Sequence, residues 1–139
     1  MRFFLYGTLL AGSGNGVATD LHRKLAPGSP AEARGSLFAV PDPDGWYPAL
    51  MHDPEGGPVR GVMHETLPPF SEADLAALDA YEGADYVRAE IPVEDGGLTF
   101  MAHAWVWAGA LPSGAEPVPD GDFAAFLMRR GLRGFGFAG

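Results

Sequence analysis

The amino-acid sequence predicts an α+β fold, in which a curled, mostly antiparallel sheet closes into a small barrel and two main helices accompany it. Two observations lead to this prediction. Several apolar segments of strand length are separated by turns that contain glycine and proline, and two other segments combine helical apolar spacing with capping residues. The 139 residues fit one domain, 1–139, which can bury roughly two-thirds of the surface that the unfolded chain exposes.

The strand predictions follow from apolar runs that end at turn residues. Arg2–Tyr6 is expected to be a buried strand, because its apolar run is continuous. Pro92 places its part of a later strand at a sheet edge or a bulge, because proline cannot donate to the ladder. The further expected strands are Ala33–Val40, Trp46–His52, Val59–Thr66, Tyr86–Glu94 and Leu98–Trp107, the last two forming a hairpin.

Both main helices carry recognisable end signals. The first begins after Ser71, a candidate N-cap, has Asp74 at its third helical position and ends before Gly83. The second is DFAAFLMRR, 122–130, with arginines in its last turn and Gly131 as its C-cap. Both segments are therefore expected to begin and end close to these residues.

Three less regular segments lie between these elements. A short helical turn is expected around 20–25, and the proline-rich segment 108–119 is expected to be a surface loop. The glycine-rich AGSGNG, 11–16, follows a strand, where such loops can bind phosphate. Val17, however, occupies the position of the third glycine of G-x-G-x-x-G. A flexible surface loop is thus favoured over a nucleotide site.

Charge and composition exclude several classes of partner. A net charge of -9 argues against nucleic acid and against an anionic membrane surface, because both need clustered Lys and Arg. The N-terminal apolar run is too short for a secretory signal, and no apolar run has the length of a membrane span. We expect a cytoplasmic location, with neither nucleic acid nor a membrane as partner. Monomer and homodimer both remain open.

The sequence gives no support for a metal site. It contains no cysteine, and its histidines have no metal-binding spacing; they are His22, His52, His64 and His103. His64 and His103 lie in expected strands and are interpreted as core or rim residues with satisfied hydrogen bonds.

Glu82 occupies an unfavourable place for a carboxylate. It falls in the last turn of the first main helix, where the helix dipole disfavours an anion, and on the apolar stripe between Leu75 and Leu78. Both effects raise a carboxyl pKa toward neutrality, which suits a general acid and base. The alternative is a partly exposed glutamate at a frayed helix end. Asp79 borders the same stripe on its other side.

Four motifs in this order resemble the gamma-glutamylcyclotransferase-like family, in its branch of gamma-glutamylamine cyclotransferases and plant avirulence-induced-gene-like proteins. They are FLYGTLLAG, GWYPAL, VRGVMHE and LDAYEG followed by Y-x-R, and the resemblance extends from Phe4 to about Trp107. It implies a small α+β fold in which a mixed, barrel-like sheet surrounds a pocket.

The resemblance also implies a site and a reaction. Glu82 corresponds to the family's catalytic glutamate, which passes a proton while the α-amine of a gamma-glutamyl substrate attacks its own γ-carbonyl. The implied products are 5-oxoproline and a free amine or amino acid, and the implied reaction requires neither a metal nor a cofactor. Asp79 is expected to be structural, with a hydrogen bond to a nearby backbone group or to Arg88. The implied substrate-binding residues are Tyr6, Gly7, Thr8, Leu9, Tyr47, Pro48 and Tyr86.

Two questions stay open at this stage. A binding or interaction module that keeps the same pocket without turnover is the alternative function. The identity of the leaving amine is also undetermined, because loops build the outer wall of such a pocket. The segments 11–16 and 108–119 and the C-terminal FGFAG depart most from the family pattern.

Overall fold

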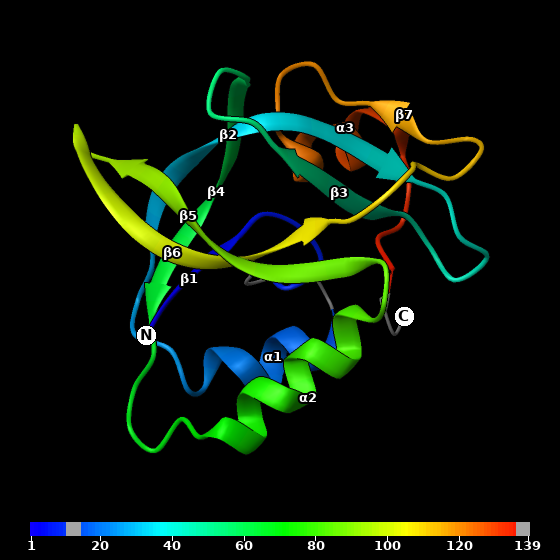
Figure 1. Cartoon of the computed structure of the whole chain (residues 1–139). Helices are drawn as coiled ribbons and strands as arrows, with labels where there is room; N and C mark the ends of the chain where they lie inside the picture. The colour runs from blue at the N-terminus through cyan, green and yellow to red at the C-terminus, as the bar shows by residue number, and fades with distance from the viewer. Residues whose placement is uncertain (11–14, 136–139) are drawn as a thin grey trace.

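The computed structural model describes residues 1–10 and 15–135, which form strands and helices in the order shown in Figure 1. The elements are β1 Arg2–Leu5, α1 Gly16–His22, β2 Ser29–Val40, β3 Tyr47–His52, β4 Gly57–Glu65, α2 Glu72–Glu82, β5 Tyr86–Asp95, β6 Leu98–Trp107, β7 Glu116–Pro117 and α3 Phe123–Arg130. Within these residues no helix is long and apolar enough to cross a membrane.

Five strands close into a barrel in the order β2, β4, β1, β6 and β5, and the Glu32↔Glu94 pair joins β5 back to β2. β1 runs parallel to β6, with Phe3 opposite His103, and the other barrel pairs are antiparallel. β3 and β7 extend the sheet along the second half of β2. The expected mixed, barrel-like α+β fold is confirmed.

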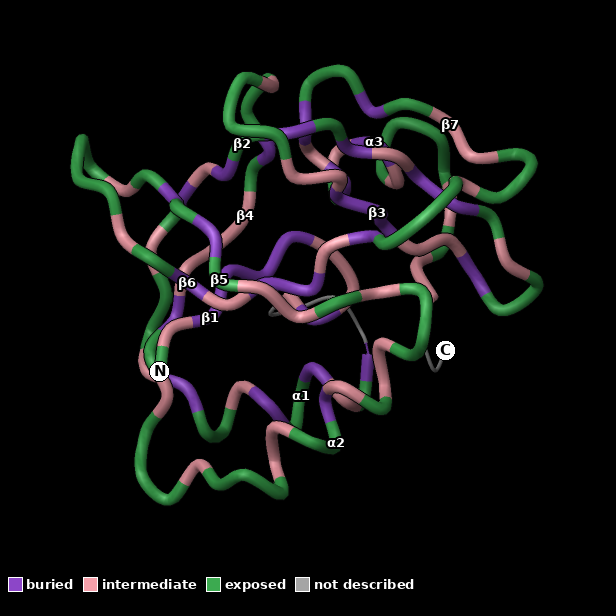
Figure 2. The backbone as a smooth tube through the Cα atoms, in the orientation of Figure 1, coloured by how far each residue is buried: buried purple, intermediate pink, exposed green. Residues whose placement is uncertain are grey.

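β1 connects the two main parts of the core. Its side chains alternate between the faces of the sheet. Phe4 and Tyr6 belong to the barrel cluster with Ile91 and Val93, whereas Phe3 and Leu5 pack with residues of α1 and α2. Figure 2 shows these buried segments in the strands and the exposed ones in the connecting loops. The expected buried strand Arg2–Tyr6 is confirmed, except that Arg2 is partly exposed and the strand ends at Leu5.

The two predicted helices begin and end close to the expected residues. Ser71 caps α2, and Ser71 and Asp74 form a capping box in which each side chain accepts from the other's backbone N–H. Gly83 ends α2 with a φ of 83°. Asp122 caps α3, and Gly131 ends it in the left-handed conformation. α1 and α2 lie together on one side of the barrel (Figure 1).

Two element boundaries and one loop were predicted wrongly. β2 begins at Ser29 rather than Ala33, because its first half pairs with β4 over Ser29–Gly35. α1 begins at Gly16 rather than near residue 20, because the Asn15 side chain accepts from Val17 and Ala18 N–H groups and caps it. The segment 108–119 contains β7, and its Val118 is buried. Residues 11–14 of the predicted glycine-rich loop lie outside the described residues.

Candidate functional site

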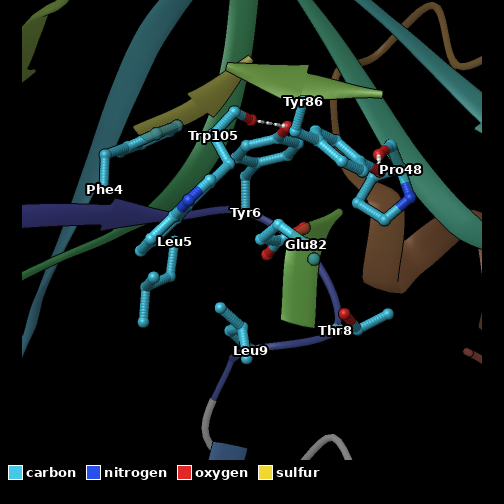
Figure 3. A pocket seen from close by; sticks show the side chains of 10 residues that line it. Phe4, Leu5, Tyr6, Thr8, Leu9, Pro48, Glu82, Tyr86 and Trp105 are labelled. Carbon is cyan, nitrogen blue, oxygen red and sulfur yellow. Dashed lines mark hydrogen bonds between the residues drawn. The ribbon is translucent and has the colours of Figure 1, made fainter. Parts of the chain in front are cut away.

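A small pocket, here called the inner pocket, opens where the chain leaves β1. It is lined by Phe4, Leu5, Tyr6, Gly7, Thr8, Leu9, Pro48, Glu82, Tyr86 and Trp105. In Figure 3 the Glu82 side chain lies between the ring of Tyr6 and the Thr8–Leu9 segment. The structure therefore brings together every residue that the sequence analysis assigned to the site except Tyr47.

Tyr6 forms a wall of the inner pocket with its ring. Its hydroxyl donates to the Trp105 carbonyl and accepts from the N–H of Leu50 at 3.4 Å. Burial and the nearby Glu82 raise the pKa of Tyr6 well above its ordinary value. The phenol is thus neutral and already hydrogen-bonded inside the protein, so it serves as a fixed wall rather than as a proton carrier.

Gly7 allows the turn after β1 to approach β3. A Cβ atom at this position would lie 2.1 Å from Cγ of Pro48, so no side chain fits here. Among the described residues no acceptor is hydrogen-bonded to the N–H of Gly7 or Leu9. Successive backbone N–H groups in such a turn can bind a carboxylate or an oxyanion. The turn therefore offers donors at a place where no side chain can enter.

Glu82 is the last residue of α2 and its carboxylate has no hydrogen-bond partner within 1–10 and 15–135. Burial, and secondarily the charge of Asp79, raises the pKa of Glu82 from 4.5 to about 8. No Lys or Arg lines the inner pocket. A carboxyl group that titrates near neutrality and is not held by a partner can exchange a proton with a bound molecule.

Asp79 has the structural role that the sequence analysis assigned to it. Its Oδ1 accepts from Arg88 Nε at 3.0 Å and from Trp105 Nε1 at 2.8 Å. The predicted contact with Arg88 is confirmed, and the indole bond to Trp105 is an additional one. Asp79 thereby fixes a pocket wall and contributes negative potential at Glu82.

A second, wider pocket continues from the first and is here called the outer pocket. It is lined by Thr8, Asp42, Tyr47, Tyr81, Glu82, Asp85, Tyr86 and Phe135. Thr8, Glu82 and Tyr86 line both pockets, so the two are contiguous. Tyr47 therefore belongs to the outer pocket, while its neighbour Pro48 lines the inner one. The Tyr86 hydroxyl donates to the Pro48 carbonyl, which joins β5 to β3 at the boundary.

Tyr81 and Asn15 hold the turn after β1 through side-chain hydrogen bonds, and the sequence analysis did not identify either residue. The Tyr81 hydroxyl lies 3.1 Å from Thr8 Oγ1 and accepts from Asn15 Nδ2. The same amide donates to the Phe135 carbonyl at 3.2 Å. Asn15 itself is only 2% exposed, and the three bonds are partly buried. Tyr81 precedes Glu82 in the LDAYEG motif, which was the only available signal; Asn15 had none.

The histidines lie away from both pockets. His64 is buried, its Nδ1 is 2.8 Å from the Ala26 carbonyl, and its ring packs edge-on against that of His22. Burial lowers the pKa of His64. His103 lies 3.4 Å from an Arg88 nitrogen and 3.6 Å from Glu90. Both histidines are partnered at the core or its rim, as expected.

Comparison with known proteins identifies the family. The model of the family described as "Gamma-glutamyl cyclotransferase, AIG2-like" matches residues 3–125. No curated protein sequence matches the chain significantly.

Three solved structures share its fold. An AIG2-like protein from Mus musculus is 24% identical with a TM-score of 0.61, covering 80% of this chain and 79% of its own. The protein PH0828 from Pyrococcus horikoshii is 16% identical with a TM-score of 0.62, covering 94% and 96%. YkqA from Bacillus subtilis is 21% identical with a TM-score of 0.70, and the match covers 94% of this chain and 42% of YkqA. Because the family model covers most of the sequence, the chain belongs to the gamma-glutamyl cyclotransferase, AIG2-like family.

Proposed function

We propose that this protein is a cyclotransferase that converts a gamma-glutamyl compound into 5-oxoproline and a free amine or amino acid. The observation that carries the proposal is Glu82, a carboxyl group without a hydrogen-bond partner among the described residues and with a pKa of about 8. It lines the same small pocket as the backbone of Gly7–Leu9. Family membership supports a cyclotransferase-type reaction.

In the proposed reaction the substrate supplies its own nucleophile. Its neutral α-amine attacks the γ-carbonyl carbon, a carbon–nitrogen bond closes the five-membered ring, and the carbonyl electrons move to oxygen. Glu82, ionised, accepts the proton that the attacking nitrogen releases. It then donates this proton to the departing nitrogen as the original amide bond breaks, and so returns to its starting form. Water is not consumed.

The sparse site suits an intramolecular reaction. Holding the substrate folded makes the two reacting atoms neighbours, so most of the acceleration comes from proximity. One positioned acid and base typically adds about 10²–10⁴-fold. The backbone N–H groups of Gly7, Thr8 and Leu9 are proposed to bind the glutamyl carboxylate or the developing oxyanion, with Tyr6, Pro48 and Tyr86 as walls.

The size of the pockets bears on how a substrate binds. The inner pocket encloses about 20 Å³, which is room for about one water molecule. For a gamma-glutamyl group to enter, the side chains at the opening of the inner pocket must therefore move, a change that commonly accompanies binding. The leaving group, having no room beside the glutamyl group, must extend into the outer pocket, where Tyr47 lies.

The test is release of 5-oxoproline by the purified protein from a panel of gamma-glutamyl amines and amino acids. We expect turnover of at least one compound, and loss of turnover in Glu82→Gln with an unchanged circular dichroism spectrum. Unchanged turnover in Glu82→Gln would contradict the role of Glu82. Binding of these compounds without ring closure across the panel would instead identify a non-catalytic binding module.

A further inference from the structure

We propose that the outer pocket binds the leaving amine and selects one that carries a second positive charge, as an aliphatic diamine does. This inference rests on the proposed function, because it assumes that the glutamyl group reacts beside Glu82. The outer pocket shares Thr8, Glu82 and Tyr86 with the inner pocket, so a leaving group attached at the γ-carbonyl enters it directly.

Two aspartates give the outer pocket its charge. Asp42 lies just after β2 and Asp85 lies between α2 and β5, and both line the pocket. Burial, and then the charges of Asp85 and Asp42, raise the pKa of Tyr47, which lines the same pocket. The outer pocket therefore carries negative charge from these two aspartates in addition to Glu82.

Neither aspartate is neutralised by the protein. Within residues 1–10 and 15–135 neither aspartate forms a salt bridge. Seven other acidic residues do form one with an arginine or a lysine: Asp20, Glu65, Asp74, Asp79, Glu94, Glu116 and Asp120. Asp42 accepts one hydrogen bond from the N–H of Asp44 at 2.9 Å. No Lys or Arg lines either pocket. A cationic group of a ligand in the outer pocket would therefore have no lysine or arginine of the lining to compete with for Asp42 and Asp85.

Aromatic rings form the rest of the outer pocket. Tyr47, Tyr81, Tyr86 and Phe135 line it, with the Phe135 ring 6.0 Å from that of Tyr47 and 6.5 Å from that of Tyr81. Ring faces attract an ammonium group and also bury a methylene chain. A flexible alkyl chain that ends in an ammonium group matches both features, whereas a carboxylate would be repelled by Asp42 and Asp85.

The available volume is appropriate for such a chain. The outer pocket holds about 180 Å³, slightly more than an engineered cavity of about 150 Å³ that binds benzene in another protein. A chain of four or five carbon atoms is comparable in size. The Glu82 carboxylate, which has no hydrogen-bond partner among the described residues, lies where the departing nitrogen would receive its proton.

The experiment compares three compounds that differ only at the far end of the leaving amine. They are the mono-γ-glutamyl derivatives of 1,4-diaminobutane, pentylamine and 5-aminopentanoate, which end in an ammonium, a methyl and a carboxylate group. We expect kcat/KM to be about tenfold higher for the ammonium compound than for the methyl compound, and lowest for the carboxylate. Added salt should reduce the difference.

Variants test which residues produce the preference. In the double variant Asp42→Asn and Asp85→Asn, we expect the ratio of kcat/KM for the ammonium and methyl compounds to fall toward one. Glu55→Gln removes the same type of charge from the turn before β4, where it lines neither pocket, and should leave the ratio unchanged. If the unaltered protein turns over all three compounds with equal kcat/KM, the proposed preference for a cationic leaving amine is overturned, while the proposed cyclotransferase function stands.

A binding measurement separates this inference from the proposed function. If none of the three compounds yields 5-oxoproline, the proposed function fails for them, and calorimetric binding to Glu82→Gln still tests the outer pocket. Tighter binding of the ammonium compound there, lost on addition of Asp42→Asn and Asp85→Asn, would support a cation site. Equal binding of the ammonium and methyl compounds, or no binding of either, would overturn it.

Discussion

Asp79 and Glu82 lie three residues apart on α2, yet only Asp79 is held by partners. Asp79 accepts hydrogen bonds from Arg88 and Trp105, whereas Glu82 accepts none among the residues that the structure describes. The pKa of Glu82 is raised to about 8, first by burial and then by the charge of Asp79. Asp79 thus fixes Trp105 in the wall of the inner pocket, and its charge raises the pKa of Glu82.

Asp79→Asn should move the pH dependence of turnover. A negative charge beside Glu82 disfavours its ionised form, so removing that charge lowers the pKa of Glu82. If ionised Glu82 accepts the substrate proton, kcat/KM should rise with pH through about 8 in the unaltered protein and through a lower pH in the variant. The measurement is kcat/KM for a gamma-glutamyl substrate between pH 5 and pH 10.

Glu72→Gln is the matched control for this experiment. It removes one negative charge from the first turn of α2, at the opposite end of the helix from Glu82. We expect the rising limb of its profile to coincide with that of the unaltered protein. A rising limb that does not move in Asp79→Asn would mean that Asp79 acts on Trp105 and Arg88 only.

Glu82→Gln should change how stability depends on pH. Because the pKa of Glu82 is about 8 in the folded protein and 4.5 ordinarily, the folded protein keeps a proton that the unfolded chain releases between these values. Stability of the unaltered protein therefore falls as pH rises through this window. Glutamine does not titrate, so the variant should become relatively more stable from pH 4.5 to pH 8, by up to about 5 kcal/mol.

Urea unfolding of both proteins at pH 4.5, 7 and 9 measures this difference. The expected result is that the two free energies of unfolding are closest at pH 4.5 and that their difference is largest at pH 9. A difference that stays constant with pH would show that Glu82 ionises in the folded protein as it does in the unfolded chain.

Local signals predicted those parts of the fold that depend on neighbouring residues. The N-cap at Ser71 and the C-cap at Gly131 were predicted correctly, because capping is decided within one turn. The start of β2 was not, since Ser29–Gly35 becomes a strand by pairing with β4 about thirty residues later. The parallel contact of β1 with β6 likewise depends on long-range closure of the barrel.

For the same reason, only part of the site could be predicted from the sequence. Glu82 could be selected because its helix position is unfavourable, and the turn after β1 came from the family motif. Asp42 and Asp85 lie in two separate connections, and nothing local distinguishes them from other surface acids. Their common pocket with Tyr47 arises only when β3 and β5 lie together in the folded chain.

Gly7→Ala should destabilise the protein and impair turnover. The new Cβ would lie 2.1 Å from Pro48 Cγ and 2.9 Å from Cδ, so the turn must move away from β3. Such overpacking typically costs about 1–3 kcal/mol. Gly57→Ala is the control, because a Cβ at Gly57 meets nothing within 4 Å. Thermal unfolding of both variants measures the effect, and equal melting temperatures would contradict a close Gly7–Pro48 contact.

Tyr81→Phe should loosen the turn that carries Thr8. The lost hydroxyl contacts Thr8 Oγ1 and Asn15 Nδ2, and removing a partner from the buried Asn15 amide costs about 1–2 kcal/mol. Tyr47→Phe is the matched control, since no hydrogen bond of its hydroxyl occurs within the described chain. We expect a lower free energy of unfolding and a higher KM for Tyr81→Phe. If its unfolding free energy equals that of Tyr47→Phe, the Tyr81 hydroxyl does not hold the turn.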